Sequence, residues 1–287
     1  MKYPRVITFL FALVACQAGI KNEEPVISPP GYDFSKPVKY LMKEELDEIS
    51  GIIYVNDSPH IVALNDEEGK LYKVNLESNE KPSHFKFAKK GDFEDLCFDG
   101  RYWYAMKSKG IVFRIKNAFS DSFSVKEFPF PEMGNEFETI FYDPSVKKTI
   151  ILCKQCISSV NGRIPAYSLD TTTSTFPYES MYSPDTLSIM NMLGKKKIKF
   201  RPSGAAINPL TGELYILASS DKLLLIMKGG EIRQVIKLSK NLFRQPEGIT
   251  FAPNGDLYIS NEAKDAIANI LLFRYDPTRI TTTPRKP

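Results

Sequence analysis

Histidine is scarce in this sequence, which contains two such residues, His60 and His84, among its 287 positions. Neither is accompanied by a nucleophile in a pattern that resembles a hydrolytic triad. Four cysteines are present, but a zinc site needs about four Cys or His ligands at matched spacing, which is not seen here. Cys153 and Cys156, in the run CKQC, form either a local disulfide or a pair of reduced thiols.

Clustered positive charge is also missing. The formal net charge is +4, and the run of lysines at 195–197 is brief. Nucleic-acid-binding domains normally concentrate Lys and Arg along one face or one helix, so nucleic acid is a poor default partner. The content of hydrophobic residues (43%) and charged residues (25%) is that of a globular protein with a large core.

The N-terminal apolar run is too short to cross a bilayer as a helix. Positively charged MKYPR precedes VITFLFALVA, which has the length of a signal-peptide core, and the run ends in Leu13-Val14-Ala15-Cys16. Small residues followed by Cys resemble a bacterial lipobox. This pattern predicts cleavage after residue 15 and lipidation, including palmitate, of Cys16. The alternative is an ordinary signal peptide with a chance cysteine.

The sequence after Cys16 is polar and rich in proline, which is typical of a flexible tether. We expect this tether to extend over residues 16–39 and the folded domain to occupy 40–287. Acyl chains on Cys16 would anchor the exported protein to a membrane of the cell envelope. An Asp directly after the lipidated Cys would resemble an inner-membrane retention signal. This sequence has Gln17 at that position, and we therefore expect the outer membrane.

A short motif, in which a polar residue precedes an apolar strand and a turn, occurs five times. Its equivalent positions are Ser50, Glu94, Glu138, Ser203 and Glu247, separated by 44, 44, 65 and 44 residues. Three equal steps are unexpected by chance, and the long step contains 21 additional residues. We assign the addition to residues 178–197 and expect a short helix there.

Each motif begins a unit with further short apolar runs, which the spacing predicts as four strands in 40–45 residues. Such a unit is typical of a β-propeller blade. The sequence therefore predicts an all-β propeller of five four-stranded blades. Six blades are the alternative, if residues 31–45 and the C-terminus build an irregular blade.

Propeller geometry gathers the motif positions at one mouth of the central channel. The loops between second and third strands open on the same face, because successive strands alternate in direction. These loops add Asn65, Asp66, Lys107, Lys154 and Glu262 to the five motif residues. Several carboxylates in a narrow ring either have raised pKa values or hold cations. Two solutions remain open: a Ca²⁺ ion, or pairing of Lys107 with Glu94 and of Lys154 with Glu138.

The motifs also resemble a known family. EISGI, DFEDL, EFETI, RPSGAAI, QPEGITF with NGDLYISNE, and LLFRY resemble, in order over about residues 40–276, the SdiA-regulated (YjiK-like) bacterial propellers, distant relatives of NHL-repeat proteins. The resemblance implies an exported, membrane-associated five-bladed propeller with a calcium site. The positions that match this site are Glu94, Glu138, Glu247 and Glu262. Asp95 and Thr139 depart from the small residue expected after the glutamate.

Two functions are consistent with this pattern. The first is a monomeric, non-enzymatic module that holds calcium and binds a protein or small-molecule ligand at the propeller face. The alternative is a calcium-dependent hydrolase, phytase-like or lactonase-like, with Glu247 or Glu94 as base and Lys107 and Lys154 binding an anionic substrate. Two basic residues at the predicted ring are few for a phytase, which favours the binding module.

Overall fold

The computed structural model describes residues 26–280 except 56–58, 158–161 and 265. The predicted signal peptide, the predicted lipidation site Cys16 and residues 17–25 of the predicted tether lie outside the described residues. In the described part of the chain, no helix is long and apolar enough to span a membrane.

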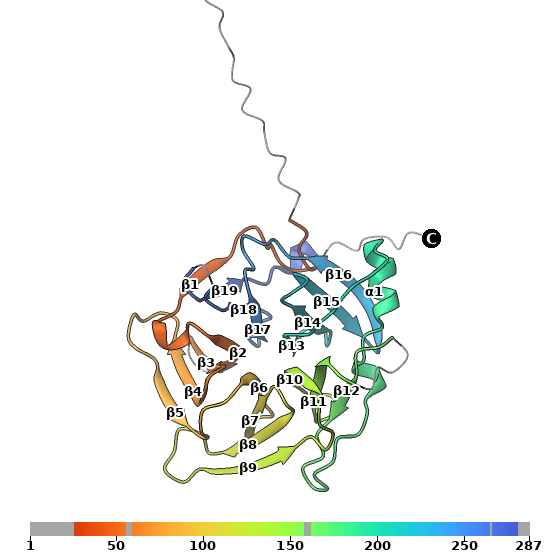
Figure 1. The fold of residues 1–287 in the computed structure, drawn as a ribbon. Helices are drawn as coiled ribbons and strands as arrows, with labels where there is room; N and C mark the ends of the chain where they lie inside the picture. Colours follow the sequence, from red (N-terminus) through yellow and green to blue (C-terminus); the bar gives the residue numbers. More distant parts are fainter. Residues whose placement is uncertain (1–25, 56–58, 158–161, 265, 281–287) are drawn as a thin grey trace, which may run out of the picture.

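Five antiparallel sheets surround a central channel, so the predicted five-bladed propeller is confirmed (Figure 1). Blade 1 contains β2 (Ile49–Val55), β3 (His60–Asn65), β4 (Glu68–Asn75) and β5 (Ser83–Lys86). Blade 2 contains β6 (Phe93–Phe98), β7 (Tyr102–Lys107), β8 (Ile111–Lys116) and β9 (Ser124–Pro129). Blade 3 contains β10 (Glu136–Asp143), β11 (Lys148–Gln155) and β12 (Ala166–Ser168). Blade 4 contains β13 (Gly204–Ile207), β14 (Leu214–Ala218), β15 (Leu223–Lys228) and β16 (Glu231–Lys237).

Blade 5 joins the two ends of the chain. Its strands are β17 (Pro246–Phe251), β18 (Leu257–Asn261), β19 (Asn269–Phe273) and, on the outside, β1 (Val38–Leu41). β1 pairs antiparallel with β19, from Val38 opposite Leu272 to Leu41 opposite Asn269. This pairing closes the ring and covers the edge of β19. Part of the 31–45 segment therefore completes the fifth blade, and the described residues form no sixth blade.

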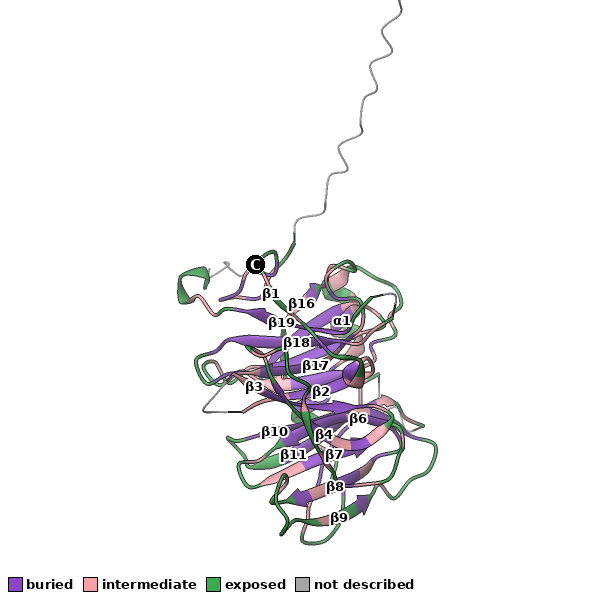
Figure 2. Cartoon of the chain, turned by 90° about the vertical axis from the view of Figure 1, so that its left-hand side faces the viewer, coloured by how far each residue is buried: buried purple, intermediate pink, exposed green. Residues whose placement is uncertain are grey.

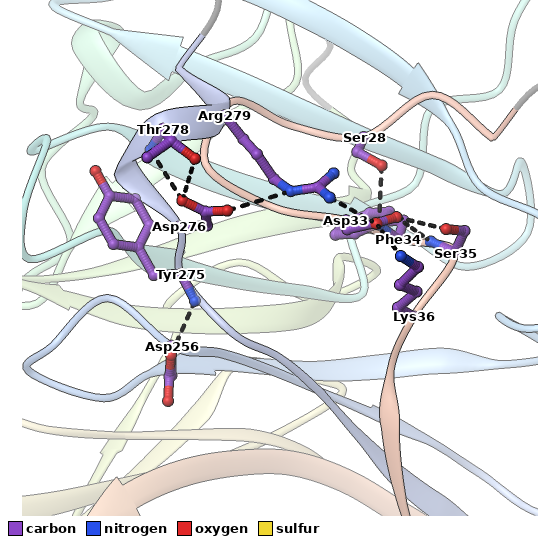
Figure 3. A network of polar contacts seen from close by, with 10 residues as sticks. All are labelled: Ser28, Asp33, Phe34, Ser35, Lys36, Asp256, Tyr275, Asp276, Thr278 and Arg279. Carbon is purple, nitrogen blue, oxygen red and sulfur yellow. Dashed lines mark hydrogen bonds and ion pairs between the residues drawn. The ribbon is translucent and has the colours of Figure 1, made fainter.

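Residues 26–37 pack on the propeller, so the folded part begins before residue 40. Phe34 is 1% exposed and its ring lies 4.4 Å from that of Phe273, measured between centroids. Figure 3 shows how this segment is joined to the C-terminal end: Arg279 lies 3.1 Å from Asp33 and 3.4 Å from Asp276. The Phe34 backbone N–H also donates to Ser28 Oγ at 2.8 Å. The proline-rich, polar composition of this segment predicted a tether and gave no sign of this packing. The contacts that Asp33 and Phe34 make are with residues more than 200 positions away in the sequence.

The core consists of five hydrophobic clusters, one between each pair of adjacent blades. In β14, Tyr215 and Leu217 face blade 5, whereas Leu214, Ile216 and Ala218 face blade 3. This alternation follows from the two-residue period of a strand, and both faces are buried because each blade packs between two others (Figure 2). In β14, whose sequence is LYILA, every residue is therefore apolar and buried.

The expected helix lies in the predicted insertion. α1 (Thr186–Leu193) follows η2 (Ser180–Tyr182), and two other short 3-10 helices are η1 (Glu44–Leu46) and η3 (Pro277–Arg279). Asp185 caps α1 by accepting from the N–H groups of Leu187 and Ser188, and Gly194 ends it with φ 62°. α1 contacts β16 on the outside of blade 4 (Figure 1). The insertion follows β12 where the other blades have a fourth strand, and blade 3 has three strands.

Candidate functional site

The inner strands β2, β6, β10, β13 and β17 contact one another in cyclic order and line the channel. Their motif ends approach so closely that some positions have no room for a side chain. A Cβ on Gly204 would lie 2.3 Å from the Glu247 carbonyl oxygen, and one on Gly248 would lie 2.5 Å from the Ser50 carbonyl oxygen. Glycine after the motif residue is therefore a packing requirement in blades 4 and 5.

Asp95 departs from this rule and lies buried between the inner strands. A Cβ on Gly51 would lie 2.2 Å from Asp95 Oδ1, so the carboxyl group occupies the space beside that glycine. Asp95 Oδ1 accepts from the N–H of Leu96 at 2.8 Å, and Oδ2 accepts from the N–H of Ile140 in blade 3 at 2.9 Å. Burial raises the pKa of Asp95. This residue links the inner strands of adjacent blades and does not face the mouth pocket.

The serines at two motif positions also connect neighbouring blades. Ser50 Oγ donates to the Phe93 carbonyl oxygen at 3.1 Å, and Ser203 Oγ donates to the Pro246 carbonyl oxygen at 2.8 Å. Each acceptor directly precedes the motif glutamate of the next blade. The serines thus hold the backbone beside Glu94 and Glu247 in register with the preceding blade.

A polar pocket of about 670 Å³ occupies the mouth of the channel, lined by residues from all five blades. The predicted site residues that line it are Ser50, Asp66, Glu94, Glu138, Lys154, Glu247 and Glu262. Carboxyl groups separated by more than 190 positions in the sequence, such as Asp66 and Glu262, thus face a common space. The predicted gathering of motif and loop residues at one mouth accounts for seven of the fifteen lining residues.

Three predicted mouth residues lie elsewhere. Ser203 forms the inter-blade bond described above, and Asn65 donates to the Glu45 carbonyl oxygen at 3.3 Å. The Lys107 ammonium lies 4.8 Å from the ring centre of Phe93 and 5.5 Å from that of Phe113. The ion pair expected between Lys107 and Glu94 therefore does not form, because the lysine turns toward the aromatic rings of its own blade.

Lys154, in contrast, forms the ion pair that the second of the two predicted solutions required. Its ammonium forms an ion pair with Glu138, which is on the neighbouring strand of the same blade. The disulfide between Cys153 and Cys156 encloses Lys154 in a four-residue loop, with 6.0 Å between the two Cα atoms. The remaining described cysteine, Cys97, is a buried free thiol.

Four other carboxyl groups at the mouth have raised pKa values. Burial raises the pKa of Glu94 to about 8, with the charge of Asp92 adding to it and that of Lys154 opposing it. Burial raises the pKa of Glu247 to about 7, against the opposing effects of a Ser219 hydrogen bond and the Lys222 charge.

The pKa values of the other two carboxyl groups, Glu262 and Asp66, are raised as well. Burial and a hydrogen bond with Glu48 raise the pKa of Glu262 to about 8. Burial, with the charge of Glu48, raises the pKa of Asp66 to about 6. Ionising these groups together at neutral pH costs free energy that a bound cation would offset.

The donor set matches a hard cation in chemistry. The lining carboxyl groups supply oxygen ligands, the type that Ca²⁺ prefers. Asp66 Oδ1 is buried and has no hydrogen-bond partner, so one oxygen at the mouth is unsatisfied. Across the described ranges, however, no group of three or more His, Cys, Asp or Glu side chains is already gathered around one point. Binding would therefore bring the carboxyl groups closer together.

Sequence reasoning missed half of the pocket. The residues added by the structure are Asp92, Arg201, Ser219, Ser220, Lys222, Arg244, Gln245 and Lys264. Three of them stand two positions before a motif residue, where the five blades carry Glu48, Asp92, Glu136, Arg201 and Gln245. The motifs DFEDL, RPSGAAI and QPEGITF already begin at these three residues, so the repeat contained the signal although they were not assigned to the mouth. The four basic residues come mainly from blades 4 and 5, where the motif itself is Ser203 or Glu247.

No protein-family model matches the chain, and no curated protein matches it in sequence. The glutaminyl cyclase of Myxococcus xanthus has 15% identity and a TM-score of 0.54, over 83% of this chain and 94% of that chain. A structure titled nidogen/laminin complex has 11% identity and a TM-score of 0.50, over 81% of each chain. Luciferin-regenerating enzyme has 11% identity and a TM-score of 0.49, over 83% of this chain and 95% of that chain.

These neighbours include enzymes and a protein complex. At such low sequence identity, the similarity establishes a shared fold and not a shared function. The chain is thus an all-β, five-bladed propeller with a polar, charged pocket at one mouth of its channel.

Proposed function

We propose that this protein is an envelope-anchored binding module, similar to the SdiA-regulated propellers, whose channel mouth holds a calcium ion and presents it to a ligand. The observation that carries the proposal is the crowding of Glu94, Glu247 and Glu262 in one pocket, where burial raises all three pKa values to about 7 or 8. Carboxyl groups arranged in this way are costly without a counter-ion, which supports a cation as part of the functional state.

Glu94, Glu247 and Glu262, with Asp66, are the residues that would hold the ion. Calcium accepts 6–8 oxygen ligands in loose geometry, so carboxylates from two inner strands and two loops can be combined with water or ligand oxygens. Glu138 takes a different role from the one first expected, because Lys154 already neutralises it. Bound calcium would supply a positive charge to which an oxygen of the ligand can bind.

The anchor would keep this pocket close to the membrane. Because residues 26–37 pack on the propeller, a tether from Cys16 to Val26 would span ten positions and could reach at most about 35 Å if fully extended. A monomeric propeller held at this distance from an outer membrane would meet soluble ligands or neighbouring envelope proteins. The lipobox-like sequence before Cys16 supports this location.

Calcium titration calorimetry and thermal melts on the full-length protein in detergent test the proposal. We expect calcium to bind at one site and raise the melting temperature, and magnesium to do so less, because it demands stricter octahedral geometry. The double variant Glu94→Gln/Glu247→Gln should bind calcium at least about tenfold more weakly. A protein whose melting temperature ignores calcium, with a double variant that behaves in the same way, would refute the calcium site.

A second candidate function has one specific observation in its favour. The pocket is open, about 670 Å³ in volume, and the pKa of Glu247 near 7 suits a general base at neutral pH. Such a site would fit a calcium-dependent hydrolase of phosphoesters or lactones. Hydrolysis that requires calcium and is lost in Glu247→Gln, with ligand binding retained, would select this function over the binding module.

A further inference from the structure

We propose that four basic residues at the mouth bind a compact dianionic group, such as the phosphate of a soluble phosphate monoester. These residues, here called the basic wall, are Arg201, Lys222, Arg244 and Lys264. The proposal rests on the proposed function in that it names the ligand of the same pocket. It does not depend on calcium being bound there.

The basic wall results from a change in charge around the propeller ring. Two positions before the motif residue, blades 1 to 3 carry Glu48, Asp92 and Glu136, whereas blade 4 carries Arg201. Blade 5 has Gln245 at this position and Arg244 beside it. Equivalent positions of the blades lie at the same mouth, so blades 4 and 5 bring Arg201 and Arg244 to the pocket, where Glu247 and Glu262 of blade 5 also lie.

The turns that follow the second strands of blades 4 and 5 contribute the two lysines of the basic wall. Lys222 lies in the turn between β14 and β15, and Lys264 follows β18. Burial lowers the pKa of Lys222, and the positive charges of Lys264 and Lys240 lower it further, against the effect of Glu247. Positive groups are therefore close enough to repel one another, as expected where a counter-ion normally binds.

The basic wall also lacks direct ion pairs among the described residues. None of its four side chains forms an ion pair within 4.0 Å of a carboxylate in the described ranges, in contrast to Lys154 with Glu138. The Lys222 ammonium donates to the Ser219 carbonyl oxygen at 2.6 Å, and Arg201 Nη2 donates to Gln155 Oε1 at 3.3 Å. The direct partners of these two side chains are therefore neutral, although Lys222 still feels the charge of Glu247 at longer range.

The rest of the lining favours a hydrated anion over a lipid. Ser219, Ser220 and Gln245 line the pocket together with the basic wall and can donate hydrogen bonds. The lining contains no Leu, Ile, Val, Phe or Met that could pack against an acyl chain. The guanidinium groups of Arg201 and Arg244 can each bind two phosphate oxygens. A single carboxylate has two oxygens and could form fewer of these bonds.

Titration calorimetry with inorganic phosphate tests the proposal on the full-length protein, in EDTA so that no calcium contributes. We expect saturable binding that the double variant Arg244→Gln/Lys264→Gln weakens at least about tenfold, since each lost charge-assisted bond matters. The matched control Lys228→Gln/Lys237→Gln removes two exposed charges from the outer strands of blade 4. It should change the affinity by less than about twofold. Circular-dichroism melts check that both variants remain folded.

Three results would overturn the basic wall as a phosphate site. The first is equal weakening by both double variants, which would mean attraction by net charge alone. The second is binding of acetate as tight as that of phosphate, and the third is no phosphate binding at all. None of these results bears on calcium, which Glu94→Gln/Glu247→Gln tests separately. Conversely, phosphate binding without calcium binding would refute the proposed function and leave the basic wall supported.

Discussion

Replacing Glu247 with glutamine should stabilise the calcium-free protein at alkaline pH. Burial raises the pKa of Glu247 from its ordinary value of 4.5 to about 7, so the folded state holds its proton more tightly than the unfolded state does. Folding is therefore favoured below pH 4.5 and loses stability as the pH rises from 4.5 through 7. The loss is at most about 3 kcal/mol, an upper value because the side chain is partly exposed to water at the mouth.

Glutamine has nearly the same shape and no charge to bury. In EDTA at pH 8, urea unfolding of Glu247→Gln should give a free energy of unfolding higher than wild type by up to about 3 kcal/mol, and the difference should vanish near pH 4. In a thermal melt this corresponds to a rise of up to about 10 °C for a domain of this size. Saturating calcium should reduce the difference, since it stabilises the wild-type carboxylate.

Glu138→Gln is the matched control. Glu138 lies at the same motif position in blade 3, but its partner Lys154 neutralises it. Its loss leaves a lysine without its ion pair, so we expect lower stability at pH 8, the opposite sign. If Glu247→Gln were no more stable than wild type in EDTA at pH 8, or if both variants changed stability alike, the picture of crowded, uncompensated carboxyl groups would be wrong.

Further predictions concern the fold. Phe34→Ala should lower the free energy of unfolding by about 3–5 kcal/mol in urea titrations, because the ring is fully buried in the cluster between blades 4 and 5. Met133→Ala, at an exposed position, should change the free energy of unfolding by less than about 0.5 kcal/mol. An equally small effect of Phe34→Ala would mean that residues 26–37 belong to the tether and not to the folded domain. Gly248→Ala should destabilise by more than about 1 kcal/mol, because its Cβ would lie 2.5 Å from the Ser50 carbonyl oxygen. A melting temperature unchanged by Gly248→Ala would show that the inner strands can separate at the mouth.

Much of the candidate site was accessible from the repeat. Positions 94, 138 and 247 are equivalent in register, and a closed ring of blades must bring equivalent positions together. Side-chain direction was not accessible in the same way. Lys107 and Lys154 occupy similar places at the ends of second strands, yet Lys107 turns to Phe93 while Lys154 pairs with Glu138. The choice depends on which rings and carboxylates the neighbouring strands present, and no local pattern reports this.

The basic wall and the role of Asp95 were missed for related reasons. Arg201 and Arg244 stand in loops just before the inner strands β13 and β17, and the strand pattern did not assign them to the mouth. Asp95 looked like a departure from the expected small residue, but it accepts from the Ile140 N–H and fills the space beside Gly51. A buried carboxyl group is tolerated there because backbone donors from adjacent strands meet it. Such donors can be identified only once the inner strands are placed around the channel.

By itself, the sequence determined the all-β class, the five blades and the helix in the insertion. Strand periodicity and a 44-residue repeat are local or regularly spaced signals, and each blade repeats the same burial. Tertiary structure alone decided how the ring closes, with β1 on β19, and how charge is divided across the mouth. Both depend on contacts between residues far apart in the chain, where pairing follows from the geometry of the closed ring and leaves little trace in neighbouring residues.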